Sequence, residues 1–428
     1  MTSSTGYQTA RQEFGADWPL LLAAMMGVGL ASILPYSIGI FMGPIRREFG
    51  WSAEIILAAF ASIGIMGIIG APFTGQLIKW FGARALTLAG TIVLALGTMI
   101  LGLIPNSIAA FFACYIVIAA GHTLVSAIIW QKIIVERFTK ARGLAVSIAL
   151  CGSNIAGSIS PLLATLVIEK ANWRVAYFAL GAYMFLSVFP LAWFFFRETS
   201  QDIRQSKAEK PIQLVGLTQG QAIRTLEFWV MFVSFMFAGM GITGYIVYLV
   251  PMLTSQGLSL LLAASVLSSL SMAALCGRLL AGAFMDHVFA PRLASFALML
   301  PLVSSILLLF LPSSYWIAVT AAILVGLSTG AEFNMIAYLT TRYFGLRDYG
   351  AIGGIFYGVF MLGCLGGQQL PALLLHWWGY EQVIIVFGAS FVIASTMMLA
   401  CRPYPNIEGA LSEDIVTTSR RAEPAAGR

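Results

Sequence analysis

One arginine of this chain lies where a charge is costly. The sequence holds 24 Lys and Arg residues, and all but Arg278 fall in polar segments or near the ends of apolar runs. Arg278 lies inside the apolar run 258–282, and a guanidinium keeps its proton in proteins. At membrane depth such a charge needs an anion or a water-filled cavity. We therefore interpret Arg278 as the anchor of an anionic ligand; the alternative is a structural arginine that holds two helices together.

Two serines extend this interpretation. Ser268 and Ser271 precede Arg278 at a spacing that places all three on one face of a helix. A polar stripe beside an arginine is typical of a wet surface. We expect this helix face to line a cavity.

Glu332 is the one carboxylate near the middle of an apolar run. Burial disfavours the charged form of a carboxyl group, so this side chain is suited to bind and release a proton. A proton- or substrate-binding role and a permanent ion pair with Arg278 both stay open. Asn334 lies about 200° further round the helix, so it is expected to make a different contact.

Other polar side chains could reach the same cavity. His122 is a candidate because its imidazole can titrate near neutral pH, and Asn154 because it lies at mid-depth among small residues. A packing role is the alternative for both, since small residues in membrane helices usually mark close helix contacts. Four tyrosines are further candidates for cavity hydroxyls: Tyr36, Tyr245, Tyr248 and Tyr357.

Composition indicates what kind of elements carry these residues. Apolar residues make up 59% of the chain and charged residues 10%, far from the balance of soluble domains. Runs of about 20 apolar residues predict membrane-spanning helices. We expect an all-α membrane protein with twelve spans, near 18–44, 52–78, 85–104, 107–131, 143–168, 174–196, 228–253, 259–285, 293–311, 315–341, 349–375 and 380–401.

A long polar segment divides the spans into two groups of six. The expected organisation is a tail (1–17), a six-helix bundle (18–196), a linker (197–227), a second six-helix bundle (228–401) and a second tail (402–428). If the N-terminus is cytoplasmic, nineteen Lys and Arg residues lie inside and four outside. The positive-inside rule therefore predicts cytoplasmic termini in a multi-pass protein of the cytoplasmic (inner) membrane.

The two groups of spans repeat each other. At a shift of 207 residues, Pro44 falls on Pro251, Gly50 on Gly257, Ser52 on Ser259 and Gly75 on Gly282. Parallel repeats predict two pseudo-symmetric bundles related by an axis along the membrane normal, with the ligand between them near mid-membrane.

The segment between the second and third spans resembles the signature of the major facilitator superfamily, Gly-x-x-x-Asp-(Arg/Lys)-x-Gly-x-(Arg/Lys). Here Gly75, Gly82 and Arg84 match, and Lys79 stands where the family has Asp. The second copy keeps the acid as Asp286. In the family this loop gates the cytoplasmic side. The resemblance therefore implies that gating depends on Gly75, Arg84, Gly282 and Asp286.

Within that superfamily the chain is similar to the monocarboxylate and oxalate–formate branch. The similarity rests on Phe49-Gly50-Trp51-Ser52, on residues 218–229, and on Arg278 four residues before Gly282. In that branch an arginine at this position binds the substrate carboxylate. The branch often carries an acid four residues earlier, where this chain has Ala274. The resemblance implies a secondary transporter of a small mono- or dicarboxylate, working by alternating access as a proton symporter or anion exchanger.

Three other functions compete with the transport of an organic anion. A multidrug exporter is disfavoured because Ala156 and Gly157 replace the Gly-Pro of the exporter pattern in the fifth span. A membrane sensor without flux remains open, whereas no nucleophile, metal cluster or cofactor motif indicates an enzyme. The expected partners are an organic anion, a coupling proton or counter-anion, and the lipid bilayer. We expect no cofactor, metal or nucleic acid, and a functional monomer.

Overall fold

A computed structural model describes residues 10–138, 142–196, 216–285, 287–310, 314–345, 347–377 and 379–405. Twelve helical segments in these ranges are long and apolar enough to cross a membrane, which confirms the predicted all-α membrane fold. The helices are α1 (Ala10–Phe49), α2 (Ala53–Phe81), α3 (Ala83–Leu101), α4 (Ile108–Leu124), α5 (Ala127–Arg137), α6 (Arg142–Lys170), α7 (Trp173–Phe195), α9 (Gln219–Ala222), α10 (Leu226–Ser255), α11 (Leu260–Phe284), α12 (Ala290–Phe310), α13 (Tyr315–Phe344), α14 (Tyr349–Trp377) and α15 (Tyr380–Leu399).

Two of these elements differ from their expected form. Helix α1 begins at Ala10, inside the segment 1–17 that the sequence suggested as a tail. The expected fourth span is divided into α4 and α5, because the backbone leaves the helix at Val125 and Ser126. Close packing of Gly90 against Leu124 and Val125 accompanies this break.

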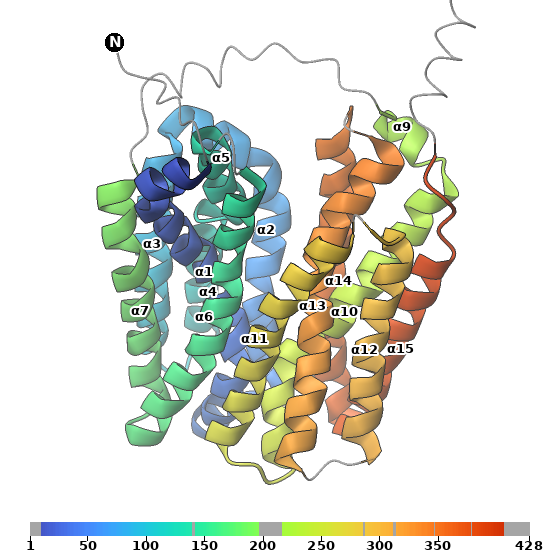
Figure 1. Cartoon of the computed structure of the whole chain (residues 1–428). Helices are drawn as coiled ribbons and strands as arrows, with labels where there is room; N and C mark the ends of the chain where they lie inside the picture. Colours follow the sequence, from blue (N-terminus) through green and yellow to red (C-terminus); the bar gives the residue numbers. More distant parts are fainter. Residues whose placement is uncertain are drawn as a thin grey trace, which may run out of the picture.

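The helices form two bundles with the same internal pairing (Figure 1). In the first bundle α1 packs on α6, α2 on α4 and α3 on α7. In the second bundle α10 packs on α14, α11 on α13 and α12 on α15, which are the corresponding pairs after a shift of six spans. The tertiary contacts therefore repeat as the sequence does.

The repeat extends to the turns. Gly50 and Gly257 both adopt positive φ angles, 72° and 94°, a conformation that glycine adopts without a steric penalty. Two residues later, Ser52 and Ser259 are the N-caps of α2 and α11. The paired glycines and serines of the sequence thus mark two equivalent helix connections.

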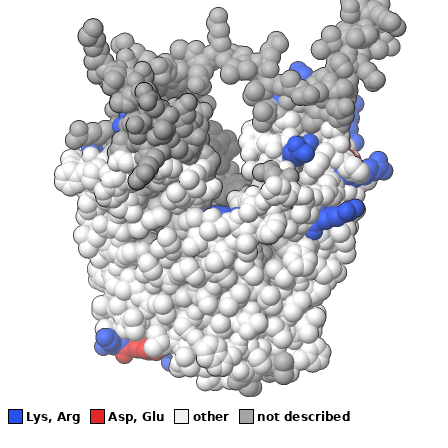
Figure 2. All heavy atoms as spheres, viewed as in Figure 1, with Lys and Arg blue, Asp and Glu red and all other residues white. Residues whose placement is uncertain are grey.

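The two bundles have a terminal face, where α1 begins and α15 ends, and an opposite face. They meet mainly where α1 faces α10, α2 faces α14 and α6 faces α11. Toward the terminal face the bundles diverge (Figure 1), and the surface is hollowed between them (Figure 2). Most of the visible Lys and Arg side chains gather near the terminal face (Figure 2).

Candidate functional site

Arg278 lies on α11 where this helix crosses α6 of the other bundle. Its side chain is buried, with 7% exposed, and its Nη1 donates a hydrogen bond of 2.5 Å to the carbonyl oxygen of Leu150 on α6. Arg278 therefore joins the two bundles directly. The structure places the positive charge at their interface, as a ligand anchor between repeats requires.

Together with the Arg278–Leu150 contact, four further side chains form what we call the α6–α11 seam: Asn154, Ser158, Ser268 and Ser271. The Ser268 hydroxyl donates to the Ser158 carbonyl at 2.7 Å and the Ser158 hydroxyl to the Ser268 carbonyl at 3.1 Å. One turn away, the Ser271 hydroxyl donates to the Asn154 carbonyl at 2.8 Å and the Asn154 amide to the Ser271 carbonyl at 3.2 Å. Each pair thus exchanges two hydrogen bonds between the bundles.

This seam corrects one expectation. Ser268 and Ser271 were expected to line a wet cavity, but both are buried and bonded to α6 in this conformation. Serine is short enough to reach a neighbouring backbone carbonyl when two helices approach closely. The stripe beside Arg278 is therefore a helix contact, and the carbonyls of α6 are the part of the site that sequence patterns did not reveal.

Tyr36 of α1 joins the same group. Its ring lies directly over Gly157 of α6, which also faces the Ser271 hydroxyl. The Tyr36 hydroxyl lies close to the Ser271 hydroxyl and within electrostatic range of Arg278. Of the side chains predicted to bind a ligand, the structure brings together Arg278, Tyr36 and Asn154.

Glu332 lies on α13 and is 3% exposed. Of the two roles left open for Glu332, the permanent ion pair with Arg278 is not formed in this conformation, because no salt bridge joins these two described residues. Gly330 of α13 packs directly against the backbone of Ala274 and Arg278. Glu332 follows Gly330 by two residues, about 200° round the helix, so it points away from α11.

Asn334 makes the different contact that the sequence suggested. Its amide donates to the backbone carbonyl of Arg278 at 3.0 Å. The Glu332 carboxyl is within electrostatic range of the Cys364 thiol of α14, and its Oε1 has no hydrogen-bond partner among the described residues. Glu332 is therefore a buried acid inside the second bundle, separate from the α6–α11 seam.

The other predicted ligand-binding side chains lie elsewhere. His122 Nε2 is 3.3 Å from the carbonyl oxygen of Ala31 on α1. Tyr245 and Tyr248 are buried in the second bundle, where their hydroxyls bond to the Ser305 hydroxyl at 2.8 Å and the Gln368 carbonyl at 2.6 Å. Tyr357 of α14 is 44% exposed and lies within electrostatic range of Cys364.

The predicted gating residues lie toward the terminal face. Arg84 donates to the Trp193 carbonyl at 2.8 Å and lies over the Trp193 ring, within its own bundle. Gly75 is part of α2, and Gly282 of α11 borders open space. Asp286 lies outside the described residues.

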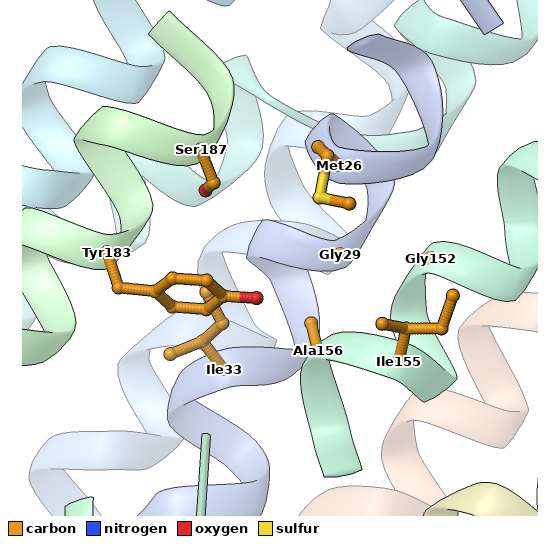
Figure 3. A pocket seen from close by; sticks show the side chains of 8 residues that line it. All are labelled: Met26, Gly29, Ile33, Gly152, Ile155, Ala156, Tyr183 and Ser187. Atoms are coloured by element: carbon orange, nitrogen blue, oxygen red, sulfur yellow. The ribbon is translucent and has the colours of Figure 1, made fainter. Parts of the chain in front are cut away.

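A separate pocket lies inside the first bundle, between α1, α6 and α7 (Figure 3). It is small, with a cavity volume of about 10 Å³, and is lined by Met26, Gly29, Ile33, Gly152, Ile155, Ala156, Tyr183 and Ser187. The Tyr183 hydroxyl points across it toward α1 (Figure 3). The pocket includes neither Arg278 nor Glu332, so the charged groups and this cavity are different parts of the molecule.

Comparisons with known proteins agree with this architecture. The family model of the Major Facilitator Superfamily matches residues 18–368. Monocarboxylate transporter 6 of Mus musculus is 27% identical over 164 residues, 38% of this chain and 35% of that protein. This chain therefore spans about a third of the length of that relative. The uncharacterized MFS-type transporter YhjX of Escherichia coli is 23% identical over 340 residues, 77% of this chain and 81% of YhjX.

A solved structure shares the fold. The crystal structure of a bacterial homologue of the human lysosomal transporter Spinster, in an inward-facing and unoccupied conformation, matches with a TM-score of 0.68. Sequence identity is 18%, and the match covers 93% of this chain and 100% of the other.

Proposed function

We propose that this chain, which belongs to the Major Facilitator Superfamily, is a secondary active transporter of small organic anions. The substrate class is mono- and dicarboxylates, moved by alternating access with a proton or in exchange for another anion. The relatedness to monocarboxylate transporter 6 supports this class. The observation that carries the proposal is the buried Arg278 at the interface of the two bundles.

The chemistry of this position favours a carboxylate. The Arg278 guanidinium donates to a neutral carbonyl on α6, whereas a carboxylate carries the opposite charge and can accept two parallel hydrogen bonds from the same guanidinium. A carboxylate arriving between the bundles would compete with the Leu150 carbonyl for the same donor. The Tyr36 hydroxyl, near both Ser271 and Arg278, would contribute a further hydrogen bond to the anion.

We assign proton coupling to Glu332. Its carboxyl is buried in the same bundle as Arg278. It lies on a face of α13 other than the one that packs against α11. A buried carboxyl with an oxygen that has no described partner is stable when it carries a proton. Glu332 would therefore gain and lose its proton when water reaches it during the transport cycle. Tyr357, partly exposed on α14, would contact the substrate path from the second bundle.

We assign the terminal face to the cytoplasm, because the order of the spans along the sequence assigns nineteen of the 24 Lys and Arg residues to the tails, linker and span ends of that side. The hollow between the bundles opens at this face (Figure 2). The described conformation would therefore receive or release its substrate on the cytoplasmic side, and the protein would lie in the cytoplasmic membrane.

A ligand screen on the purified protein tests this function. Thermal unfolding in detergent is measured with a series of mono- and dicarboxylates, with neutral amides of the same acids as controls. Carboxylates should raise the unfolding temperature of the parent, and the amides should not. Uptake of the stabilising acid into proteoliposomes should follow. Stabilisation by amides and acids alike, or binding without uptake, would contradict the proposal.

A further inference from the structure

The middle of α1 contains a backbone carbonyl that its own helix cannot satisfy. Pro35 lies inside α1 and has no N–H group. In a regular helix the N–H of residue 35 would bond to the carbonyl of Ala31, four residues earlier. That carbonyl needs another donor, because an unpaired buried carbonyl is costly in a membrane protein.

His122 of α4 lies at this carbonyl. Its Nε2 is 3.3 Å from the Ala31 oxygen. A carbonyl oxygen can only accept, so Nε2 must carry the hydrogen in this contact. Both the neutral ring with Nε2–H and the charged ring can make the bond. His122 thus replaces the helical donor that Pro35 removes.

Tyr36 follows Pro35 directly, so the geometry at Pro35 determines where the Tyr36 ring lies. On the other side of Tyr36, Gly39 packs against the Val247 carbonyl of α10, at a distance that leaves no room for a side chain. Val247 is itself four residues before Pro251, so its carbonyl is also released from the helix. Helix α1 is therefore held by neighbouring helices on both sides of Tyr36.

We propose that His122 is a positioning residue that bonds the Ala31 carbonyl released by Pro35, and so holds Tyr36 against Ser271 and Arg278. It acts on the substrate through Tyr36 and not by contact with the anion. The inference rests on the proposed function in one respect only, namely that Tyr36 contributes to binding the anion. The position of Tyr36 itself can be tested without any ligand.

The test follows the environment of Tyr36 by fluorine NMR. 3-Fluorotyrosine is placed at position 36 of the full-length protein in detergent. His122→Leu should shift or broaden its signal. His122→Gln should restore the parent signal, because its side-chain amide offers a donor at similar reach. The matched control is Thr123→Val, whose hydroxyl bonds to the Ala119 carbonyl of its own helix at 3.0 Å; its signal should stay at the parent position.

The variant Pro35→Ala provides a second background, which distinguishes hydrogen bonding by His122 from simple packing of its ring. In Pro35→Ala, the new N–H of residue 35 can bond to the Ala31 carbonyl, so His122 is no longer needed. Adding His122→Leu to Pro35→Ala should leave the Tyr36 signal where Pro35→Ala alone places it. An equal change on adding His122→Leu in both backgrounds, or an unchanged signal in His122→Leu, would overturn the inference.

Transport gives an independent readout in proteoliposomes, with the acid selected by the thermal screen as probe. His122→Leu should raise KM by about tenfold, the change expected from one lost hydrogen bond. His122→Gln should restore the parent KM. A tenfold fall in maximal rate with unchanged KM would contradict a role through Tyr36. If the screen selects no acid, the proposed function fails, whereas the NMR experiment still tests the position of Tyr36.

Discussion

Two symmetry-related contacts between the bundles are built differently. The α6–α11 seam contains two reciprocal pairs of side chain–backbone hydrogen bonds and the Arg278 contact with Leu150. Its counterpart, which we call the α2–α14 seam, is joined by one described hydrogen bond, from the Gln369 amide to the Leu57 carbonyl at 2.8 Å. Elsewhere along it, Leu365 packs against Gly64.

The repeat shows where this difference arises. At the shift of 207 residues, Ser268, Ser271 and Arg278 of α11 correspond to Ala61, Gly64 and Ala71 of α2. At these positions the first bundle therefore has small, apolar residues, whereas the second bundle has hydrogen-bond donors. Two seams with the same architecture therefore have different chemistry: the polar one is suited to recognise an anion, and the apolar one to pack and slide.

The largest effect is expected where the polar seam carries its charge. Arg278→Lys keeps the charge but loses the planar fork that binds a carboxylate with two hydrogen bonds. We expect carboxylate uptake into proteoliposomes to fall about a hundredfold, which corresponds to about 3 kcal/mol of lost binding. Insertion and folding should be retained. Arg292→Lys, at an exposed arginine outside both seams, is the matched control. Normal uptake by Arg278→Lys or by Arg278→Ala would show that the seam does not anchor the anion.

The second prediction concerns Glu332, which lies in neither seam. Glu332→Gln is isosteric but cannot carry a proton, so the variant should lose substrate accumulation driven by a pH gradient. Counterflow exchange without a gradient should stay within about threefold of the parent, because neither the seam nor Arg278 is changed. Glu381→Gln, at an exposed acid of α15, is the control. Full pH-driven accumulation in Glu332→Gln would remove Glu332 from the coupling mechanism.

The fold could be predicted from the sequence because its signals are long and repeated. Each span contributes about 20 apolar residues, and the membrane requires every backbone group in it to be bonded, so hydropathy identifies the helices well. The break at Val125 and Ser126 was missed because it accompanies contacts with Gly90 of α3. Hydropathy averaged over a span contains no information on such a contact.

The site could be predicted only by residue type. Arg278 stood out because a charge in an apolar run is rare, but the sequence left open whether Glu332 pairs with it, and in this conformation the two described residues form no salt bridge. Whether the two side chains meet depends on which faces of α11 and α13 are in contact. Gly277, Gly326 and Gly330 determine that contact. Likewise, a serine stripe indicates a polar helix face. It does not show whether water or another helix bonds to it.

A third prediction distinguishes serines of α11 that bond across the seam from a serine that bonds within α11. Ser268→Ala and Ser271→Ala each remove one hydrogen bond between the bundles, which is worth about 1 kcal/mol. Each should lower the ratio of this conformation to its alternatives by about fivefold, measured from spin-label distances across the terminal face. Ser269→Ala is the matched control, since the Ser269 hydroxyl bonds to the Val266 carbonyl of its own helix at 2.7 Å. An equal shift in Ser269→Ala would mean that the seam hydrogen bonds do not hold this state.

The smallest effect is expected at the apolar seam. Gln369→Leu removes the hydrogen bond to the Leu57 carbonyl. Because Gln369 is only partly buried, water can replace the lost donor, and we expect a change of about 0.5 kcal/mol, or roughly twofold in the same ratio of conformations. Ser62→Ala is the control, because the Ser62 hydroxyl bonds to the Ala59 carbonyl within α2 at 2.6 Å. If Gln369→Leu shifted the spin-label distances more than Ser271→Ala does, the α2–α14 seam would be the stronger contact. The asymmetry inferred from the donors of α11 would then be reversed.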